Sequence, residues 1–242
     1  MTVVDWGNCA STRLALHAAV CLFVVWNPIV GSAAPPAVVA SAAKLSEVRE
    51  FDILVDDKLA GTHRLSISTQ GDVTTTRVES DVKINLIVYV YTYKFRATEV
   101  WRADGLSQVD VQREEGGKKT SLTAKADGAN CQVVLNGRQQ VTDRSAMTTC
   151  YWRLPSPVDQ KRAVSIFDVE TGLTTSGTVE RISRVTLKVE DRPVACRHFK
   201  VTGPSPAELW FDDQDRLVRQ KSVEEGHPTE LRLRRIRPQT TE

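Results

Sequence analysis

The sequence predicts an all-β protein made of antiparallel strands, and three observations lead to this class. From residue 48 onward, apolar side chains recur with a period of two rather than 3.6. Turn-forming residues interrupt the pattern about every ten positions. No stretch of helix length carries an amphipathic stripe in this part of the chain. The patterned region of about 200 residues is within the range of a single β domain.

The first two strands are expected on either side of a tight turn. The apolar Phe51, Ile53 and Val55 alternate with other residues that include Asp52 and Asp56, and residues 57–61 then reverse the chain. The returning strand, 62–69, places His63 on the same face as the apolar Leu65. We interpret His63 as an inward histidine that is hydrogen-bonded to a neighbour, with contact to a ligand as the alternative.

Most of the remaining strands are delimited by turn residues such as Gly116-Gly117, Asp127-Gly128 and Asn136-Gly137. The expected ranges are 73–80, 106–114, 119–126, 131–135, 139–142, 163–170, 174–182, 184–190, 195–202, 207–212, 217–224 and 229–236. Residues 145–157 follow neither period and contain two prolines, which predicts a short helix or an irregular crossover near 145–157.

The segment from Val82 to Trp101 is apolar on both faces. One face is expected to hold Ile87, Tyr89, Tyr91, Tyr93 and Phe95, and the other Val82, Ile84, Leu86, Val88 and Val90. Such a strand must be covered on both sides, by a second layer, a barrel interior or a ligand. It is therefore either an ordinary core strand or the wall of a cavity. The candidate ligand-binding residues are Tyr89, Tyr91, Tyr93, Trp101, Trp152 and His63.

The first part of the chain has the pattern of a secretory signal. Arg13 precedes the apolar run 14–26, and a tract of small residues, 31–43, follows. The run is shorter than a bilayer-spanning helix, so we expect cleavage after Ala33 or Ala34 and a periplasmic or secreted protein without a stable transmembrane anchor. Cleavage near Ala43 is a second possibility. The alternative is an uncleaved N-terminal anchor in the inner membrane.

These features predict four regions. They are a signal peptide at 1–34, a flexible segment at 35–47, a single antiparallel β domain at 48–237 and a short tail at 238–242. The net charge of +2 argues against a nucleic-acid partner, which requires a concentrated positive field. The one basic run lies within 231–237, where arginines alternate with apolar residues, and it predicts a last strand with a solvated arginine face.

Three cysteines remain after removal of the signal: Cys131, Cys150 and Cys196. In an oxidising compartment two of them are expected to pair, and the pair Cys131–Cys150 closes an easily formed loop of about 20 residues. Cys196 is then a small buried hydrophobic residue. Neither the cysteines nor the scattered histidines have the spacing of metal ligands, so we expect no metal and no cofactor.

Several short motifs resemble an exported proteobacterial domain family of unknown function. They are Phe51-Asp52-Ile53, Asp57-Lys58, Gly61-Thr62-His63-Arg64, Tyr93-Lys94-Phe95, Thr98-Glu99-Val100-Trp101, Tyr151-Trp152 and Glu208-Leu209-Trp210-Phe211-Asp212. The resemblance covers residues 48–236. It implies a long, curved antiparallel sheet that forms a half-barrel or open barrel, similar to the periplasmic lipoprotein-carrier (LolA-like) domains. It implies no catalytic residues, and Cys150 departs from the family pattern, in which serine is more usual.

Two functions of different classes follow. The first is a non-enzymatic exported domain that binds a lipid or another apolar small molecule in the concavity of its sheet. The second is a structural or assembly partner of an envelope complex that pairs through exposed sheet edges with another protein. A third interpretation is an envelope hydrolase in which Cys150 pairs with His63 or His198.

Overall fold

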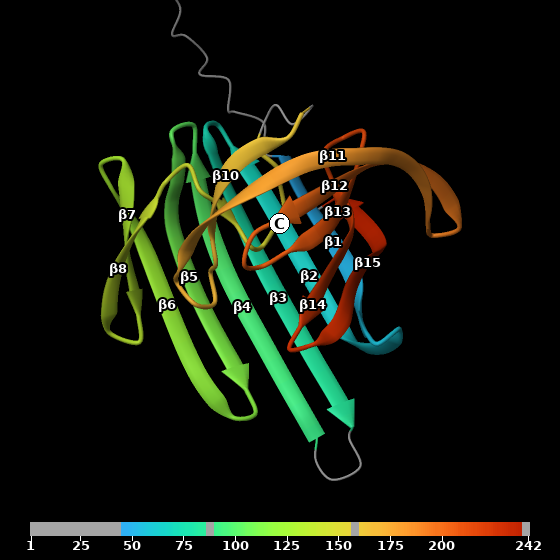
Figure 1. Cartoon of the computed structure of the whole chain (residues 1–242), viewed down its shortest axis with the longest axis horizontal. Coiled ribbons are helices and arrows are strands. Elements are labelled where there is room, and N and C mark those ends of the chain that lie inside the picture. Colours follow the sequence, from blue (N-terminus) through green and yellow to red (C-terminus); the bar gives the residue numbers. More distant parts are fainter. Residues whose placement is uncertain (1–44, 86–89, 156–159, 239–242) are drawn as a thin grey trace, which may run out of the picture. The chain divides into compact units, whose positions relative to one another are not determined.

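The computed structural model describes residues 45–85, 90–155 and 160–238, which belong to one compact unit, Ser41–Glu242. Its elements are strands throughout (Figure 1). They are β1 Leu45–Val55, β2 Lys58–Gln70, β3 Val73–Asn85, β4 Val90–Arg102, β5 Gly105–Glu115, β6 Lys118–Asp127, β7 Asn130–Leu135, β8 Arg138–Asp143, β9 Met147–Thr148, β10 Arg162–Phe167, β11 Thr174–Val189, β12 Arg192–Thr202, β13 Ala207–Asp212, β14 Leu217–Glu224 and β15 His227–Pro238. The expected signal peptide and cleavage site, and Tyr89, lie outside the described residues.

All fifteen strands belong to one sheet, in the order β8-β7-β6-β5-β4-β3-β2-β1-β15-β14-β13-β12-β11-β10-β9. Strands that follow one another in the chain are neighbours in the sheet, except β8 and β9, which lie at its two ends. The pairing of β1 with β15 joins the first half of the chain to the second. Every pairing is antiparallel apart from the short parallel contact of β9 with β10. Phe51 shows the join between the two halves, because it lies opposite His63 on one side and Leu233 on the other. The all-β class and the open, curved sheet that we expected are confirmed.

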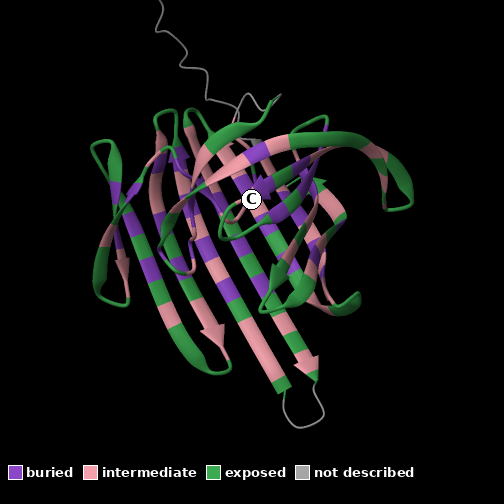
Figure 2. Ribbon diagram, viewed as in Figure 1, coloured by how far each residue is buried: buried purple, intermediate pink, exposed green. Residues whose placement is uncertain are grey.

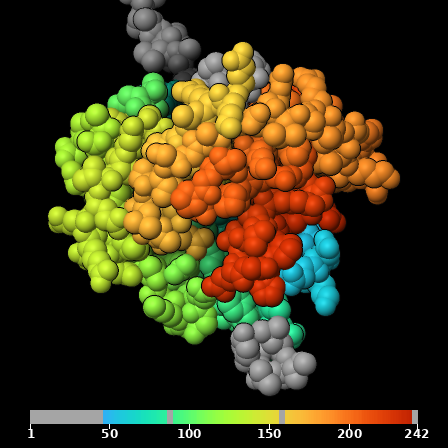
Figure 3. Space-filling model, viewed as in Figure 1, coloured from blue at the N-terminus to red at the C-terminus, as the bar shows by residue number. Residues whose placement is uncertain are grey.

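The sheet curls so that β10–β14 cover the inner face of β2–β6 (Figures 1 and 3). Direct contacts join the two layers: the Thr174 hydroxyl donates to the Thr142 hydroxyl at 2.7 Å, and Gly172 (φ +74°) passes close to Leu122. Buried residues alternate with exposed ones along the long strands (Figure 2). The largest apolar side chains that are fully buried come from both halves: Phe51, Leu65, Leu106, Val109 and Leu122 from the first, and Ile166, Phe167, Phe199, Leu209, Phe211 and Leu217 from the second. The concavity of the sheet is therefore filled by the core.

The predicted facing of the segment 82–101 was wrong. Strand β3 ends at Asn85 and β4 begins at Val90, and the two pair antiparallel with Tyr91 opposite Ile84. Directly opposed residues of neighbouring strands share a face of the sheet. Ile84 therefore lies on the same face as Tyr91, whereas an uninterrupted alternation would have put them on opposite faces.

Two other boundaries differ from the expected ranges. The segments predicted as 174–182 and 184–190 form the single strand β11, and a bulge between Arg181 and Ser183 accounts for the change of phase. Strand β10 ends at Phe167, which leaves Glu170 in the turn that follows. The crossover near 145–157 is irregular in its described part, where its only regular element is β9.

The last strand has the expected arginine face. Leu233 of β15 is buried, while arginines beside it form ion pairs with acidic groups of β1 and of β15 itself. Arg234 and Arg235 both reach Glu50, and Arg232 donates to Glu230 at 2.9 Å. Three arginines of the basic run are thus held in ion pairs with neighbouring carboxylates.

Cys131, Cys150 and Cys196 are free thiols, so the predicted Cys131–Cys150 disulfide is not formed. Cys131 is buried in β7, where its thiol points to the carbonyl of Leu106, and Cys150 lies in the crossover beside Glu99.

Within residues 45–85, 90–155 and 160–238 there is no helix with the length and apolarity that a membrane crossing requires.

Candidate functional site

The most unusual group in the core is the carboxylate of Glu99 on β4, which is fully buried. Its Oε2 accepts hydrogen bonds from two indoles, Trp101 Nε1 at 2.8 Å and Trp152 Nε1 at 2.9 Å. Trp101 follows two residues later on the same face of β4, whereas Trp152 comes from the crossover. The two rings pack edge to face with their centroids 6.2 Å apart. Glu99 therefore ties the crossover to the sheet through Trp152.

Two polar atoms beside this contact have no hydrogen-bond partner among the described residues. They are Glu99 Oε1 and Thr76 Oγ1, which belong to directly opposed residues of β4 and β3. The Cys150 thiol also lies against the carboxylate. Burial, reinforced by the negative charge of Glu99, raises the pKa of this thiol well above its ordinary value. Cys150 is thus protonated at neutral pH and is a poor nucleophile.

Arg153 covers the two tryptophans from outside. Its guanidinium carbon lies 3.9 Å from the centre of the Trp101 ring and 5.1 Å from that of Trp152. Among the described residues it forms no hydrogen bond and no ion pair. Burial lowers the pKa of Arg153 and the charge of Glu99 opposes this, but an arginine stays charged in either case. The site therefore presents an unpaired cation on an aromatic support.

A pocket of about 330 Å³ opens beside Arg153. Its lining comes from three segments: the end of β4 with the turn to β5, the region of β9, and the crossover. The lining residues are Trp101, Ala103, Asp104, Gly105, Ser145, Ala146, Met147, Thr148, Arg153, Leu154 and Pro155. Arg144 fixes one wall, since it donates to Asp104 at 2.6 Å and to the Leu106 carbonyl at 2.9 Å. The pocket thus combines an apolar floor with a free positive charge.

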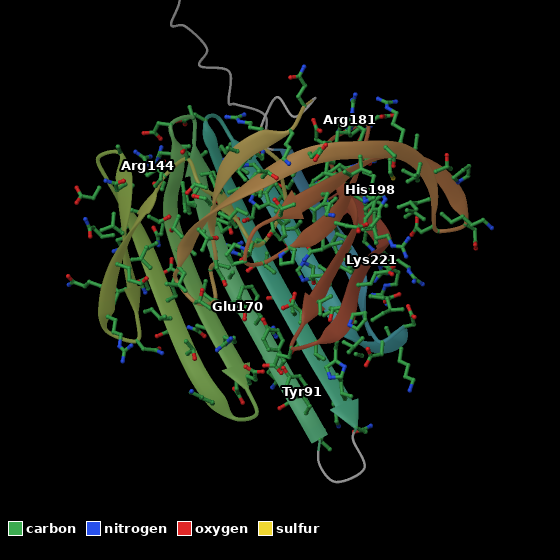
Figure 4. The ribbon with its side chains drawn as sticks, viewed as in Figure 1. Tyr91, Arg144, Glu170, Arg181, His198 and Lys221 are labelled. Atoms are coloured by element: carbon green, nitrogen blue, oxygen red, sulfur yellow. The ribbon has the colours of Figure 1, made fainter. Side chains whose placement is uncertain are left out.

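The tyrosines of β4 form a second polar group near the opposite end of the strand; Figure 4 labels Tyr91 there and Arg144 at the other end. Tyr91 donates to Glu115 at 2.8 Å, and Tyr93 donates to Glu170 at 2.9 Å. Arg113 also donates to Glu170, at 3.2 Å. Burial, followed by the nearby carboxylates, raises the pKa of both tyrosines. Their hydroxyls are thus protonated and already bonded within the protein.

The predicted site residues therefore divide into separate groups. Trp101 and Tyr93 are eight positions apart on β4, which is roughly 26 Å at about 3.3 Å per residue. His63 belongs to neither group: it is buried on β2, shares a hydrogen bond of 2.8 Å with Ser80 and meets the ring of Phe51. Burial lowers its pKa to about 4. Of the five candidates that the structure describes, Trp101 and Trp152 contact each other, and Trp101 also lines the pocket.

Sequence reasoning missed Glu99 and Arg153. The period of two places Glu99 on the same face as Phe95, Ala97 and Trp101, and a carboxylate at an inward position is a signal that was available. Nothing comparable marks Arg153, because it lies in the crossover, where no periodicity predicts which way a side chain points.

The arrangement offers little support for catalysis. The hydrogen bonds of His63 and His198 go to Ser80 and Glu208, so the cysteine–histidine pair considered from the sequence is not formed. In the described part of the chain, no three side chains of the kinds that bind metals are grouped. The groups gathered at the pocket are the aromatic ring of Trp101, the apolar side chains of Ala146, Met147 and Leu154, and the cation of Arg153.

Comparison with known proteins gives a family and a fold. The profile of DUF6134, a domain of unknown function, matches residues 51–234. The structure resembles the crystal structure of a beta-barrel-like protein of the domain of unknown function DUF1849 from Brucella abortus, with a TM-score of 0.60 and 9% sequence identity, covering 81% of this chain and 99% of that chain. At this identity the likeness shows the fold alone. No curated protein matches the chain. The expected membership of a family of unknown function is confirmed, and the likeness to lipoprotein carriers stays a prediction.

Proposed function

The chain belongs to the DUF6134 family of domains of unknown function, and from this premise we propose that it is an exported, non-enzymatic domain that binds a small, partly apolar ligand in the pocket beside Trp101. The signal pattern of residues 1–34 supports a periplasmic or secreted location, with an N-terminal anchor in the inner membrane as the alternative. A lipid-derived molecule is one ligand of this kind.

The observation that carries the proposal is the pocket itself. Its volume of about 330 Å³ lies at the small end of the range for ligand sites. Trp101, Met147 and Leu154 give it apolar walls, and burial of a ligand against them is worth roughly 25 cal/mol per Å² of apolar area. A ligand along the concavity of the sheet is not supported, because core side chains fill that space.

The non-enzymatic part of the proposal rests on protonation states. The Cys150 thiol is protonated and the imidazole of His63 is neutral and hydrogen-bonded to Ser80. Cys150 has no histidine partner, and the pair of His63 and Ser80 is buried in the core, away from the pocket that would hold a substrate.

A second candidate function is supported by the edge of the sheet. Strand β8 is the last strand on its side and pairs only with β7. Val141 of β8 is 55% exposed, which is high for a valine in a strand. An unpaired edge with an exposed apolar side chain can accept a strand of another protein. This would make the domain an assembly partner in the envelope.

A fluorescent, uncharged probe tests the pocket directly. N-phenyl-1-naphthylamine should brighten on mixing with the processed protein, purified from a bacterial envelope without detergent. The substitution Ser145→Trp places a large ring at the exposed rim of the pocket and should abolish the signal. The matched control Thr171→Trp changes an exposed residue outside the pocket lining and should leave the signal intact. A signal that S145W retains would place apolar binding elsewhere and overturn the proposal.

Native mass spectrometry of the same samples extends the test to the natural ligand. A small extra mass that is kept by T171W and lost by S145W would support binding in the pocket. A protein-sized extra mass that is lost when Val141 is replaced by Lys would favour the edge of β8 instead.

A further inference from the structure

We propose that the ligand of this pocket carries an oxyanion, a carboxylate or a phosphate, which docks on the guanidinium of Arg153 while the apolar part of the ligand enters the pocket. This inference rests on the proposed function and adds the chemical class of the ligand.

The first argument is the position of Arg153. Its side chain lines the pocket, and its guanidinium carbon lies over the ring of Trp101, 3.9 Å from the ring centre. Stacking of this kind occupies the π face of the guanidinium and leaves the N–H groups along its edge free. Those donors form the planar fork that fits the two oxygens of a carboxylate or a phosphate. Among the described residues no carboxylate takes that place.

The second argument is the balance of charge at the pocket. Asp104 is the acidic residue of the lining, and Arg144 neutralises it at 2.6 Å. Glu99 lies behind the tryptophans, where it accepts their indole N–H groups at 2.8 and 2.9 Å. Arg153 feels the charge of Glu99 only from a distance, and among the described residues it has no direct ion-pair partner on its pocket side. An anionic group entering from the solvent would complete this pair.

The third argument is rigidity. Glu99 fixes Trp101 and Trp152 by hydrogen bonds, so the support under Arg153 is formed before any ligand arrives. A preformed support lowers the entropy cost of binding. The ligand should also carry an apolar group next to its anionic group, because the apolar side chains of Ala146, Met147 and Leu154 lie in the same lining. A short amphiphile satisfies both requirements, whereas a bare anion satisfies one.

The test uses displacement of N-phenyl-1-naphthylamine by four competitors that share parts of the proposed ligand. Octanoate and octyl phosphate carry both parts, 1-octanol only the chain, and acetate only the charge. On the wild-type protein, octanoate or octyl phosphate should displace the probe at a concentration about tenfold below that of 1-octanol, and acetate should have no effect. Whichever of the two anions is stronger identifies the carboxylate or the phosphate.

The substitution Arg153→Gln should remove the preference. Octanoate should then compete only as well as 1-octanol, when both are corrected for the affinity of R153Q for the probe. The control Arg138→Gln removes an exposed arginine of β8 outside the pocket lining and should keep the tenfold preference.

Equal competition by octanoate and 1-octanol on the wild type, or a preference that survives in R153Q, would refute the anion site while the pocket stands. Absence of probe binding to the wild type would instead refute the proposed function, and the anion site with it.

Discussion

Folding stability should fall between about pH 8 and pH 5 because of one residue, His63. Burial lowers the pKa of His63 in the folded protein to about 4, from 6.5 when it is exposed. The unfolded chain therefore binds a proton in a pH range where the folded chain does not. Stability from the neutral imidazole is fully present above pH 6.5 and is lost as the pH falls towards 4.

The size of the effect follows from the two pKa values. A shift of one pKa unit corresponds to about 1.4 kcal/mol, so the full difference of 2.5 units is worth about 3 kcal/mol below pH 4. At pH 5 about 2 kcal/mol of this is already lost. The pKa of the acidic groups Glu50 and Glu230 is lowered in the fold, so their loss of stability begins mainly at more acidic pH.

The assay is urea unfolding followed by tryptophan fluorescence, at several pH values from 8 to 5. The wild type should lose about 2 kcal/mol of unfolding free energy over this range. The variant His63→Gln, which keeps a polar partner for Ser80, should lose much less. His227→Gln alters an exposed histidine and should behave as the wild type does. If H63Q shows the same pH dependence as the wild type, His63 is not the cause and the argument from its burial fails.

Three further outcomes are expected. Glu99→Leu should lower the free energy of unfolding, measured by thermal unfolding, by about 2–4 kcal/mol, because two indole donors lose a charged acceptor. The control Glu79→Leu, on the solvent-exposed side of β3, should be nearly neutral. An E99L protein as stable as the wild type would contradict this expectation. Tyr93→Phe should lower the free energy of unfolding, measured by urea unfolding, by about 1–2 kcal/mol, because the hydrogen bond to Glu170 is lost. An unchanged free energy would show that this hydrogen bond is no stronger than the hydrogen bonds that the same groups make with water. The Cys150 thiol should react with Ellman's reagent much more slowly in the folded protein than after unfolding, because its pKa is raised well above the ordinary value. Rapid reaction of the folded protein that is absent from Cys150→Ser would refute the raised pKa.

Much of the fold could be predicted because local signals agree with it. The period of two and glycine turns such as Gly116-Gly117 correspond to the hairpins of β5 to β8. Where the signal was missing, the prediction failed. Residues 86–89, between β3 and β4, are apolar or aromatic and include no glycine or proline, so Asn85 is the single turn-forming residue at this boundary.

The site was less predictable because it depends on contacts between distant segments. Trp101 and Trp152 were selected as aromatic residues, but the sequence did not show what brings them together. That residue is Glu99, whose carboxylate binds Trp152, 53 positions further along the chain. The tyrosines were selected for their hydroxyls, but the partner of Tyr93 is Glu170, which lies 77 positions away. The period of two predicts which face of a strand a side chain lies on, but it does not predict which side chain from another segment contacts it.

The pairing of β1 with β15 has a consequence for how the chain reaches this structure. Glu47 lies opposite Pro238, so the two halves of the sheet are joined side by side only when nearly the whole domain has been synthesised. Until then β1 offers one unpaired edge and must wait for a strand about 180 positions away, which makes this closure a slow step. A chaperone that shields the edge of β1, or a partner strand that occupies it, would act on folding before any ligand is met. The pairing of β1 with β15 is thus a step at which another protein could speed or delay the folding of the domain.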